Sequence, residues 1–196
     1  MYISPREYAD RIHSALFDNR LHKSIEDAAN LIEATIKSDG IIYVCGNGGS
    51  AAIANHLVCD CQKGISTNTD LTPRIVSLAS NVPIITAIAN DIGYAEIFSH
   101  QIKNFIRPND IVLTISSSGN SPNVKNAIVL AQVKGNKVIS FCGFDGGYSK
   151  KADVCVHVQE DNYGIVEDCH QAIMHMIAQN IRHRNLVNDG SKIYPF

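Results

Sequence analysis

The sequence lacks an excess of charge of either sign, because 17 Lys and Arg residues stand against 19 Asp and Glu residues, a formal net charge of -2. Proteins that mainly hold nucleic acid or an anionic membrane surface need an excess of Lys and Arg. Long apolar runs are also missing. The apolar runs that do occur, such as Ile41 to Cys45, are far too short to span a bilayer. The first residues, MYISPREYAD, lack the basic start and apolar stretch of a signal peptide. We therefore expect a cytoplasmic protein with no nucleic-acid partner and no membrane partner.

The cysteines include no pair with the two-residue spacing of a zinc knuckle, and nothing in the sequence marks a secreted, disulfide-bonded chain. Half of them lie inside apolar, strand-like runs, where a thiol behaves as a small hydrophobic side chain. We therefore expect reduced and mostly buried thiols. The positions are Cys45, Cys59, Cys61, Cys142, Cys155 and Cys169.

Internal repeats, low-complexity tracts and long linkers are absent, and 196 residues with 45% hydrophobic content suit one domain with a sizeable core. We expect a single domain over 1–196, divided into a helical arm (1–40), an α/β core (41–187) and a tail (188–196). In the arm, apolar residues recur at helical spacing and Asp39-Gly40 supplies a stop, which predicts one long helix or two consecutive ones. Such an arm either packs between subunits or covers the chain's own sheet.

From Ile41 onward, short and continuous apolar runs alternate with helical patterns. Continuous runs are typical of strands covered on both faces, and strands that alternate with helices form parallel sheets. We therefore predict an α/β fold, a three-layer α/β/α sandwich with a five-stranded parallel sheet, flavodoxin-like in outline. The predicted strands are 41–46, 74–79, 110–116, 137–143 and 154–158, and the predicted helices are 50–62, 82–106 with a break at 90–93, 122–134 and 164–187.

Two strand ends carry turns suited to an anion, and sheets of this kind bind ligands at the carboxyl ends of their strands. The first turn is Gly46-Asn47-Gly48-Gly49-Ser50, whose glycines allow backbone amides to approach a ligand at a helix start. It lacks the lysine of a P-loop, and alone it could be a plain tight turn. The second, Ser116-Ser117-Ser118-Gly119-Asn120-Ser121, offers several hydroxyl donors before a helix that begins near Pro122. A helix cap needs only one such side chain, so we predict a phosphate-monoester site here.

These two turns, in this order, resemble those of the sugar isomerase (SIS) domain, and most closely those of its phosphoheptose isomerase branch. The likeness rests on the GNGGSAA turn at 46–52, the Asn-Asp-x-Gly-Tyr stretch at 90–94, the serine loop at 116–121 and a C-terminal helix that carries His. It covers essentially the whole chain, including the arm. The resemblance implies an SIS fold, a phosphorylated ketose as substrate, and a homotetramer with active sites at subunit interfaces.

Two helices carry residues of acid–base and metal chemistry. His56 and Asp60 are four residues apart and so share one face of the helix at 50–62. Glu167 and His175 are about two turns apart on the last helix, while His170 falls to one side. A single pair of this kind is most often a solvated pair. Two of them beside a phosphate site point to catalysis, with His170 in a supporting position or at an interface.

In phosphoheptose isomerases the matching positions carry His-x-x-x-Glu on the first helix and Gln and His on the last, and these side chains can bind zinc beside the sugar. The resemblance therefore implies one zinc ion per subunit, held by His56, Asp60, Glu167 and His175. Asp60 stands where the family has Glu, and Glu167 stands where it has Gln; both remain oxygen ligands that zinc accepts. These departures leave open which carboxylate is the base, so Asp60, Glu167 and His175 form the predicted catalytic set.

The resemblance implies an aldose–ketose isomerisation of sedoheptulose 7-phosphate to D-glycero-D-manno-heptose 7-phosphate through an enediol(ate), the first step of nucleotide-activated heptose biosynthesis. The altered carboxylates keep another phosphorylated ketose as an alternative, and a non-catalytic SIS protein that binds the replication initiator is a second one. A regulatory SIS domain lacks support, because no basic helix-turn-helix segment accompanies the chain. The predicted substrate-binding residues are Asn47, Gly48, Gly49, Ser50, Asn90, Asp91, Ser116, Ser117, Ser118 and Ser121.

Overall fold

The computed structural model describes residues 3–187 and confirms the predicted α/β fold; the predicted tail at 188–196 lies outside the described residues. Five strands form one sheet, with every neighbouring pair parallel, in the order β2-β1-β3-β4-β5. The middle strands are buried almost throughout, which is why they read as continuous apolar runs. Each strand lies within a predicted run: β1 (Ile41–Gly46), β2 (Arg74–Ser77), β3 (Ile111–Ser116), β4 (Lys137–Cys142) and β5 (Val154–His157).

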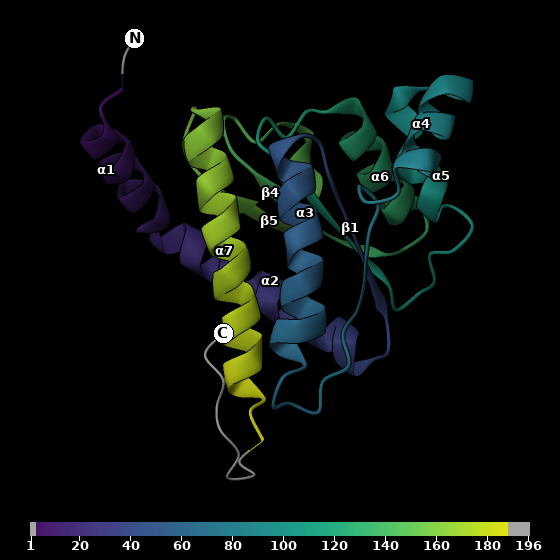
Figure 1. Ribbon diagram of the computed structural model, residues 1–196, viewed down its shortest axis with the longest axis horizontal. Coiled ribbons are helices and arrows are strands. Elements are labelled where there is room, and N and C mark those ends of the chain that lie inside the picture. Colours follow the sequence, from purple (N-terminus) through teal and green to yellow (C-terminus); the bar gives the residue numbers. More distant parts are fainter. Residues whose placement is uncertain (1–2, 188–196) are drawn as a thin grey trace.

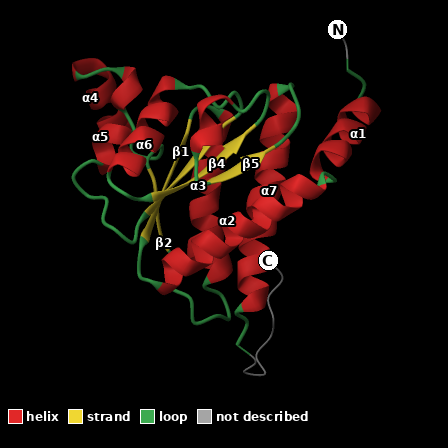
Figure 2. Cartoon of the chain, turned by 180° about the vertical axis from the view of Figure 1, so that it is seen from behind, coloured by secondary structure: helices red, strands yellow, loops and turns green. Residues whose placement is uncertain are grey.

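Helices cover both faces of the sheet and complete the three layers (Figure 1; Figure 2). Successive side chains of β1 alternate between the faces, so Ile42 and Val44 join one core and Tyr43 joins the other. The first core is covered by α2 (Asn19–Lys37), α3 (Gly49–Cys59) and α7 (Tyr163–Arg184). The second is covered by α4 (Val82–Asp91), α5 (Ser99–Ile102) and α6 (Pro122–Val133).

The N-terminal arm is two helices rather than one. α1 (Pro5–Leu16) ends before Asp18, whose side chain caps α2 by accepting a hydrogen bond from the Arg20 amide. α2 buries Ala28 and Ile32 against the chain's own sheet. This part of the arm therefore covers the sheet of its own chain, one of the two roles expected for the arm. α1 contains no fully buried residue and lies at the edge of the molecule (Figure 1). It contacts α7, and Arg11 forms ion pairs with Glu160 and Asp161 just before that helix.

Two predicted helices end elsewhere than expected. The helix at 50–62 is α3 followed by a π-helical turn, Asp60–Ile65, and such turns are frequent at functional sites. The stretch at 82–106 divides at Gly93, whose φ of 137° suits glycine alone, and its second part, α5, ends at Ile102. The amides of Phe105 and Ile106 both return to the Ile102 carbonyl, which closes the helix early.

The order of the strands brings the two predicted turns together. β1 and β3 are neighbours, with Gly46 opposite Ile115, while β2 lies on the other side of β1. The chain therefore changes direction across the sheet at β1, and the crevice beyond the carboxyl ends of β1 and β3 is where such folds bind ligands.

Within residues 3–187, none of the helices combines the length and the apolar character needed to cross a membrane.

Candidate functional site

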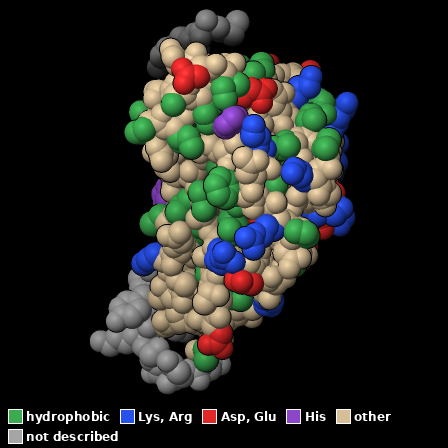
Figure 3. Space-filling model, turned by 90° about the vertical axis from the view of Figure 1, so that its right-hand side faces the viewer, with side chains coloured by type: hydrophobic (Ala, Val, Ile, Leu, Met, Phe, Trp, Pro, Cys, Tyr) green, Lys and Arg blue, Asp and Glu red, His purple; other side chains and the backbone are tan. Residues whose placement is uncertain are grey.

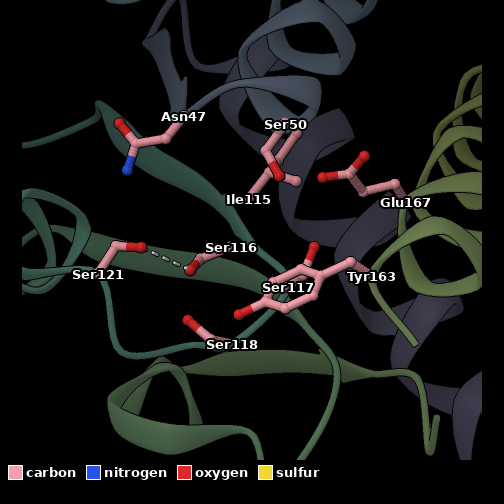
Figure 4. A pocket seen from close by; sticks show the side chains of 9 residues that line it. All are labelled: Asn47, Ser50, Ile115, Ser116, Ser117, Ser118, Ser121, Tyr163 and Glu167. Carbon is pink, nitrogen blue, oxygen red and sulfur yellow. Dashed lines mark hydrogen bonds between the residues drawn. The ribbon is translucent and has the colours of Figure 1, made fainter. Parts of the chain in front are cut away.

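The glycine turn after β1 and the serine loop after β3 form walls of one cavity of about 140 Å³ (Figure 4). Ile115, Tyr163 and Glu167 complete its lining. Six of the ten residues predicted to bind substrate line it, namely Asn47, Ser50, Ser116, Ser117, Ser118 and Ser121. The structure thus brings together, at the end of two neighbouring strands, the side chains that the sequence separates by almost seventy residues.

The hydroxyl groups of this cavity are not used to cap helices. Ser121 occupies the N-cap position of α6, yet its side chain makes no capping hydrogen bond. The N-cap residue of α3 is Gly48, so that helix also has no side-chain cap. The Ser117 hydroxyl is buried and has no hydrogen-bond partner among residues 3–187. The hydroxyls of Ser116 and Ser121 lie 3.4 Å apart. Two helix N-termini and several available donors therefore face one cavity, an arrangement that suits a phosphate group.

The Glu167 side chain lies against the backbone of the glycine turn at Gly49. A Cβ atom at Gly49 would lie 2.3 Å from Glu167 Oε2, closer than any real contact. The Glu167 carboxylate points toward Ser50 across the cavity (Figure 4). The glycine turn therefore accommodates this carboxylate from α7 in addition to any ligand.

A second group of polar side chains lies where α3 passes into its π-helical turn. Asp60 is buried, with its Oδ1 atom 3.5 Å from His56 Nε2 and its Oδ2 atom 2.8 Å from His175 Nδ1. The contact to His175 lacks the direction of a hydrogen bond, and Oδ2 makes none within the described part of the chain. One donor atom from each of the three side chains lies within 4.8 Å of the others. A buried carboxylate between two imidazoles fits a divalent metal ion by donor type and spacing.

Gln171 is a member of this group that the sequence analysis missed. Its Nε2 atom lies 3.0 Å from His56 Nδ1 and 3.1 Å from His175 Nε2. Each imidazole is therefore held at one ring nitrogen by Asp60 and at the other by Gln171. The sequence spacing could have predicted this position, because Glu167, Gln171 and His175 follow at intervals of four residues and so share one face of α7.

Glu167 is not part of the group of His56, Asp60 and His175, although the sequence analysis expects it as a fourth metal ligand. α3 and α7 pack side by side and run in the same direction (Figure 1). At about 1.5 Å per residue, Glu167 lies about 12 Å before His175 along α7. The Glu167 side chain belongs to the serine-lined cavity, with Gln171 between the cavity and the His56–Asp60–His175 group.

Proteins of known family are similar to this chain in sequence and in fold. The SIS domain family model matches residues 6–143. A phosphoheptose isomerase of Rhodospirillum rubrum is 35% identical over 155 residues, which cover 79% of this chain and 82% of that protein. One of Sulfurimonas denitrificans is 33% identical over 181 residues, 91% of this chain and 92% of that protein.

The chain belongs to the phosphoheptose isomerase branch of the SIS domain family. The solved structure of a phosphoheptose isomerase from Neisseria gonorrhoeae superposes with a TM-score of 0.82 at 30% identity, covering 91% of this chain and 94% of that one. The structure of a phosphoheptose isomerase from Francisella tularensis superposes with a TM-score of 0.76 at 30% identity, and the match covers 84% of this chain and 88% of that one. The resemblance expected from the motifs is thereby confirmed, and the chain is an isomerase.

Within this isomerase, two predicted substrate-binding residues lie apart from the cavity. Asn90 and Asp91 are exposed at the end of α4, where the Asn90 side chain donates to Asp91 at 2.7 Å. Their stretch reaches the cavity through Tyr94, whose hydroxyl donates to Asn47 Oδ1 at 3.0 Å. Asn123, which the sequence analysis did not select, exchanges two side-chain hydrogen bonds with Asn47. These partners fix the Asn47 amide at the rim of the cavity.

His170 has neither of its expected positions in the described chain. It is fully buried on the side of α7 that faces the sheet, with its ring centroid 5.7 Å from that of Phe141. Burial lowers the pKa of His170 to about 4, because the charged imidazolium is poorly solvated there. His170 is therefore a neutral core residue of this isomerase.

Proposed function

We propose that this isomerase converts sedoheptulose 7-phosphate to D-glycero-D-manno-heptose 7-phosphate, the first step of nucleotide-activated heptose biosynthesis. One observation carries the proposal. A cavity with serine hydroxyls lies at the N-termini of two helices. Farther along the packed helices α3 and α7 lies the buried Asp60 carboxylate, between the imidazoles of His56 and His175. A sugar phosphate that isomerises needs an anion site at one end and acid–base groups at its carbonyl end. The relatives named above carry the name of this activity.

In this proposal the phosphate lies among Ser50 and the four serines of the loop, held by hydroxyls and by the helix N-termini. Asn47, fixed by Tyr94 and Asn123, orients sugar hydroxyls. A carboxylate removes a proton from the carbon beside the carbonyl group, the enediol(ate) forms, and the proton returns to the neighbouring carbon. Without a bound metal, His175 would donate a proton to the carbonyl oxygen.

We further propose that His56, Asp60 and His175 hold one zinc ion per subunit. Three protein ligands leave one coordination position open, the pattern of catalytic rather than structural zinc. When bound, the ion stabilises negative charge on the oxygen of the reacting carbonyl group. Gln171 supports the ligands, because an imidazole that binds metal is oriented by a partner at its other ring nitrogen. Glu167 is then available for another role.

The proposed reaction is tested by incubating the purified protein with sedoheptulose 7-phosphate and following product formation by NMR, with and without a chelator. We expect product from the phosphorylated sugar, a strong decrease with the chelator, and none from unphosphorylated sedoheptulose. Other ketose phosphates, assayed in parallel, address the alternative substrate that the altered carboxylates allow. Turnover of such a sugar without turnover of sedoheptulose 7-phosphate would replace the substrate and keep the reaction class.

We expect the double replacement Ser118→Ala and Ser121→Ala to raise KM by at least about 100-fold, because each lost hydrogen bond to a charged group costs about 1.5–3 kcal/mol. Steady-state kinetics with the phosphorylated sugar measures the change. Ser14→Ala, at an exposed position on α1, is the matched control and should leave KM unchanged. An unchanged KM in the double variant would contradict the proposal that the serine loop binds the phosphate.

We propose a homotetramer with active sites at the subunit interfaces. α1 buries none of its residues, and Phe17 at its end is 70% exposed. Hydrophobic side chains also reach the surface formed by α4 to α6, where Val82 is 64% and Val133 is 79% exposed (Figure 3). Asn90 and Asp91, apart from the cavity of their own chain, would be free to reach that of a neighbour. Light scattering at micromolar concentration should give four times the chain mass, and a monomer would contradict the proposal.

A further inference from the structure

Two cysteines lie together on the neighbouring strands β4 and β5, outside the site described above. Cys142 ends β4 and Cys155 lies in β5, and their Sγ atoms are 3.5 Å apart. Cys155 pairs with Ser140 and Cys142 pairs with His157, so both thiols lie on one face of the sheet. Both are free thiols, Cys142 buried and Cys155 partly exposed.

The surroundings of the pair distinguish the two sulfur atoms. The two thiols share a hydrogen bond in which either sulfur can be the donor. This hydrogen bond and the Lys150 ammonium group lower the pKa of Cys155. The same hydrogen bond, reinforced by burial, raises the pKa of Cys142. The thiolate is the form of cysteine that reacts with oxidants, and reactive cysteines lie partly exposed beside positive charge. Cys155 meets these conditions, and Cys142 lies within reach as the resolving thiol.

We propose that Cys142 and Cys155 are a redox site that hydroperoxides oxidise to a disulfide and that dithiols reduce again. In the first step the Cys155 thiolate attacks hydrogen peroxide, an S–O bond forms, the O–O bond breaks, and the departing hydroxide takes up a proton to become water. In the second step the Cys142 sulfur, losing its proton, attacks Cys155 Sγ; the S–S bond forms and the sulfenic oxygen leaves as a second water. Two electrons pass from the two thiols to one peroxide.

Closing this disulfide must move the backbone at the ends of β4 and β5. The two residues are diagonal neighbours, about 8 Å apart at Cα for strands about 4.8 Å apart with a rise of about 3.3 Å per residue. Relaxed disulfides join Cα atoms about 4.4–6.8 Å apart, with sulfur atoms at about 2.05 Å. The sulfurs must therefore approach from 3.5 Å, and the strand ends and the segment between them must shift.

The segment between β4 and β5 supports the serine loop. The Gly143 amide donates to the Ser117 carbonyl at 2.8 Å, and the Ser149 amide donates to the Gly119 carbonyl at 3.2 Å. A Cβ atom at Gly119 would lie 2.2 Å from the Gly146 carbonyl oxygen, so the two backbones are in direct contact. We expect oxidation of the cysteine pair to loosen the serine loop and weaken phosphate binding.

The test treats the reduced full-length protein with one to two equivalents of hydrogen peroxide. Intact-mass and peptide analysis should find the loss of two hydrogens and a Cys142–Cys155 cross-link that dithiothreitol removes. Cys59→Ser, which deletes the exposed cysteine and keeps the pair, should still form the cross-link. Cys142→Ser should stop at a sulfenic acid on Cys155. Absence of the cross-link in both the wild-type protein and Cys59→Ser would overturn the proposal.

Coupling to the serine loop is measured by amide hydrogen exchange, which does not depend on the reaction catalysed. In the cross-linked protein, exchange at 116–121 and at Ser149 should accelerate about tenfold, while exchange in α2 should stay constant. The affinity for inorganic phosphate should fall about tenfold in parallel. A cross-link that leaves loop exchange unchanged would contradict the coupling. A reduced protein that binds no phosphate, with loop exchange altered as expected, would count against the proposed phosphate site and not against the redox pair.

Discussion

Replacing Glu167 with Gln should lower kcat by about 100-fold or more and leave KM within about twofold, because a general base contributes about 10²–10⁴-fold and acts mainly in the transition state. Two observations favour Glu167 over Asp60 as the base. Asp60 is already held between His56 and His175, whereas Glu167 lies outside that group, on the face of α7 that leads through Gln171 to His175. Asp60 is also one methylene shorter than the glutamate of the family, so its carboxylate reaches less far. Gln keeps the shape that packs against Gly49 and removes only the charge.

The matched variant is Asp60→Asn. It should bind less metal and lose activity in step with the metal, and added zinc should restore part of its rate. Steady-state kinetics of both variants, with metal content determined on the same samples, separates the two roles. Wild-type kcat in Glu167→Gln together with an inactive, fully metal-loaded Asp60→Asn would assign the base to Asp60.

Replacing His56 with Ala should remove nearly all bound zinc from protein purified without chelators, where we expect close to one equivalent per wild-type chain. Zinc sites of this kind rely on three protein ligands, and a carboxylate with one imidazole holds the ion poorly. Elemental analysis after dialysis measures the change without any assay of activity. Gln171→Ala should weaken metal binding by about 10–100-fold, the usual effect of losing a partner that orients a ligand.

His13→Ala is the control for the metal experiment, since His13 is an exposed imidazole on α1, outside the group. Its metal content should equal that of the wild-type protein. Full activity in protein that carries no metal would contradict the zinc proposal and leave His56, Asp60 and His175 as an acid–base group.

The sequence by itself determined the sheet and both turns of the cavity. The three middle strands are covered on both faces and read as continuous apolar runs, a local pattern that made them predictable. The edge strands β2 and β5 are less buried, and they were predictable as short apolar runs between helical patterns. Glycines at the first turn and serines at the second are also local signals, because each serves the backbone and the helix that follows it. The pairing of His56 with Asp60 follows from helix geometry alone.

Only the tertiary structure decided which side chains meet across elements. Glu167 lies against Gly49, and Gln171 lies between His56 and His175, because α3 and α7 pack in one particular axial alignment that no pattern within either helix specifies. His170 is buried because that side of α7 faces the sheet, although a histidine on this helix suggested a position near the catalytic site or at an interface. The contact between Cys142 and Cys155 depends on the register of β4 and β5. Local spacing fixes which residues share a face of one element, and packing between elements fixes which faces meet.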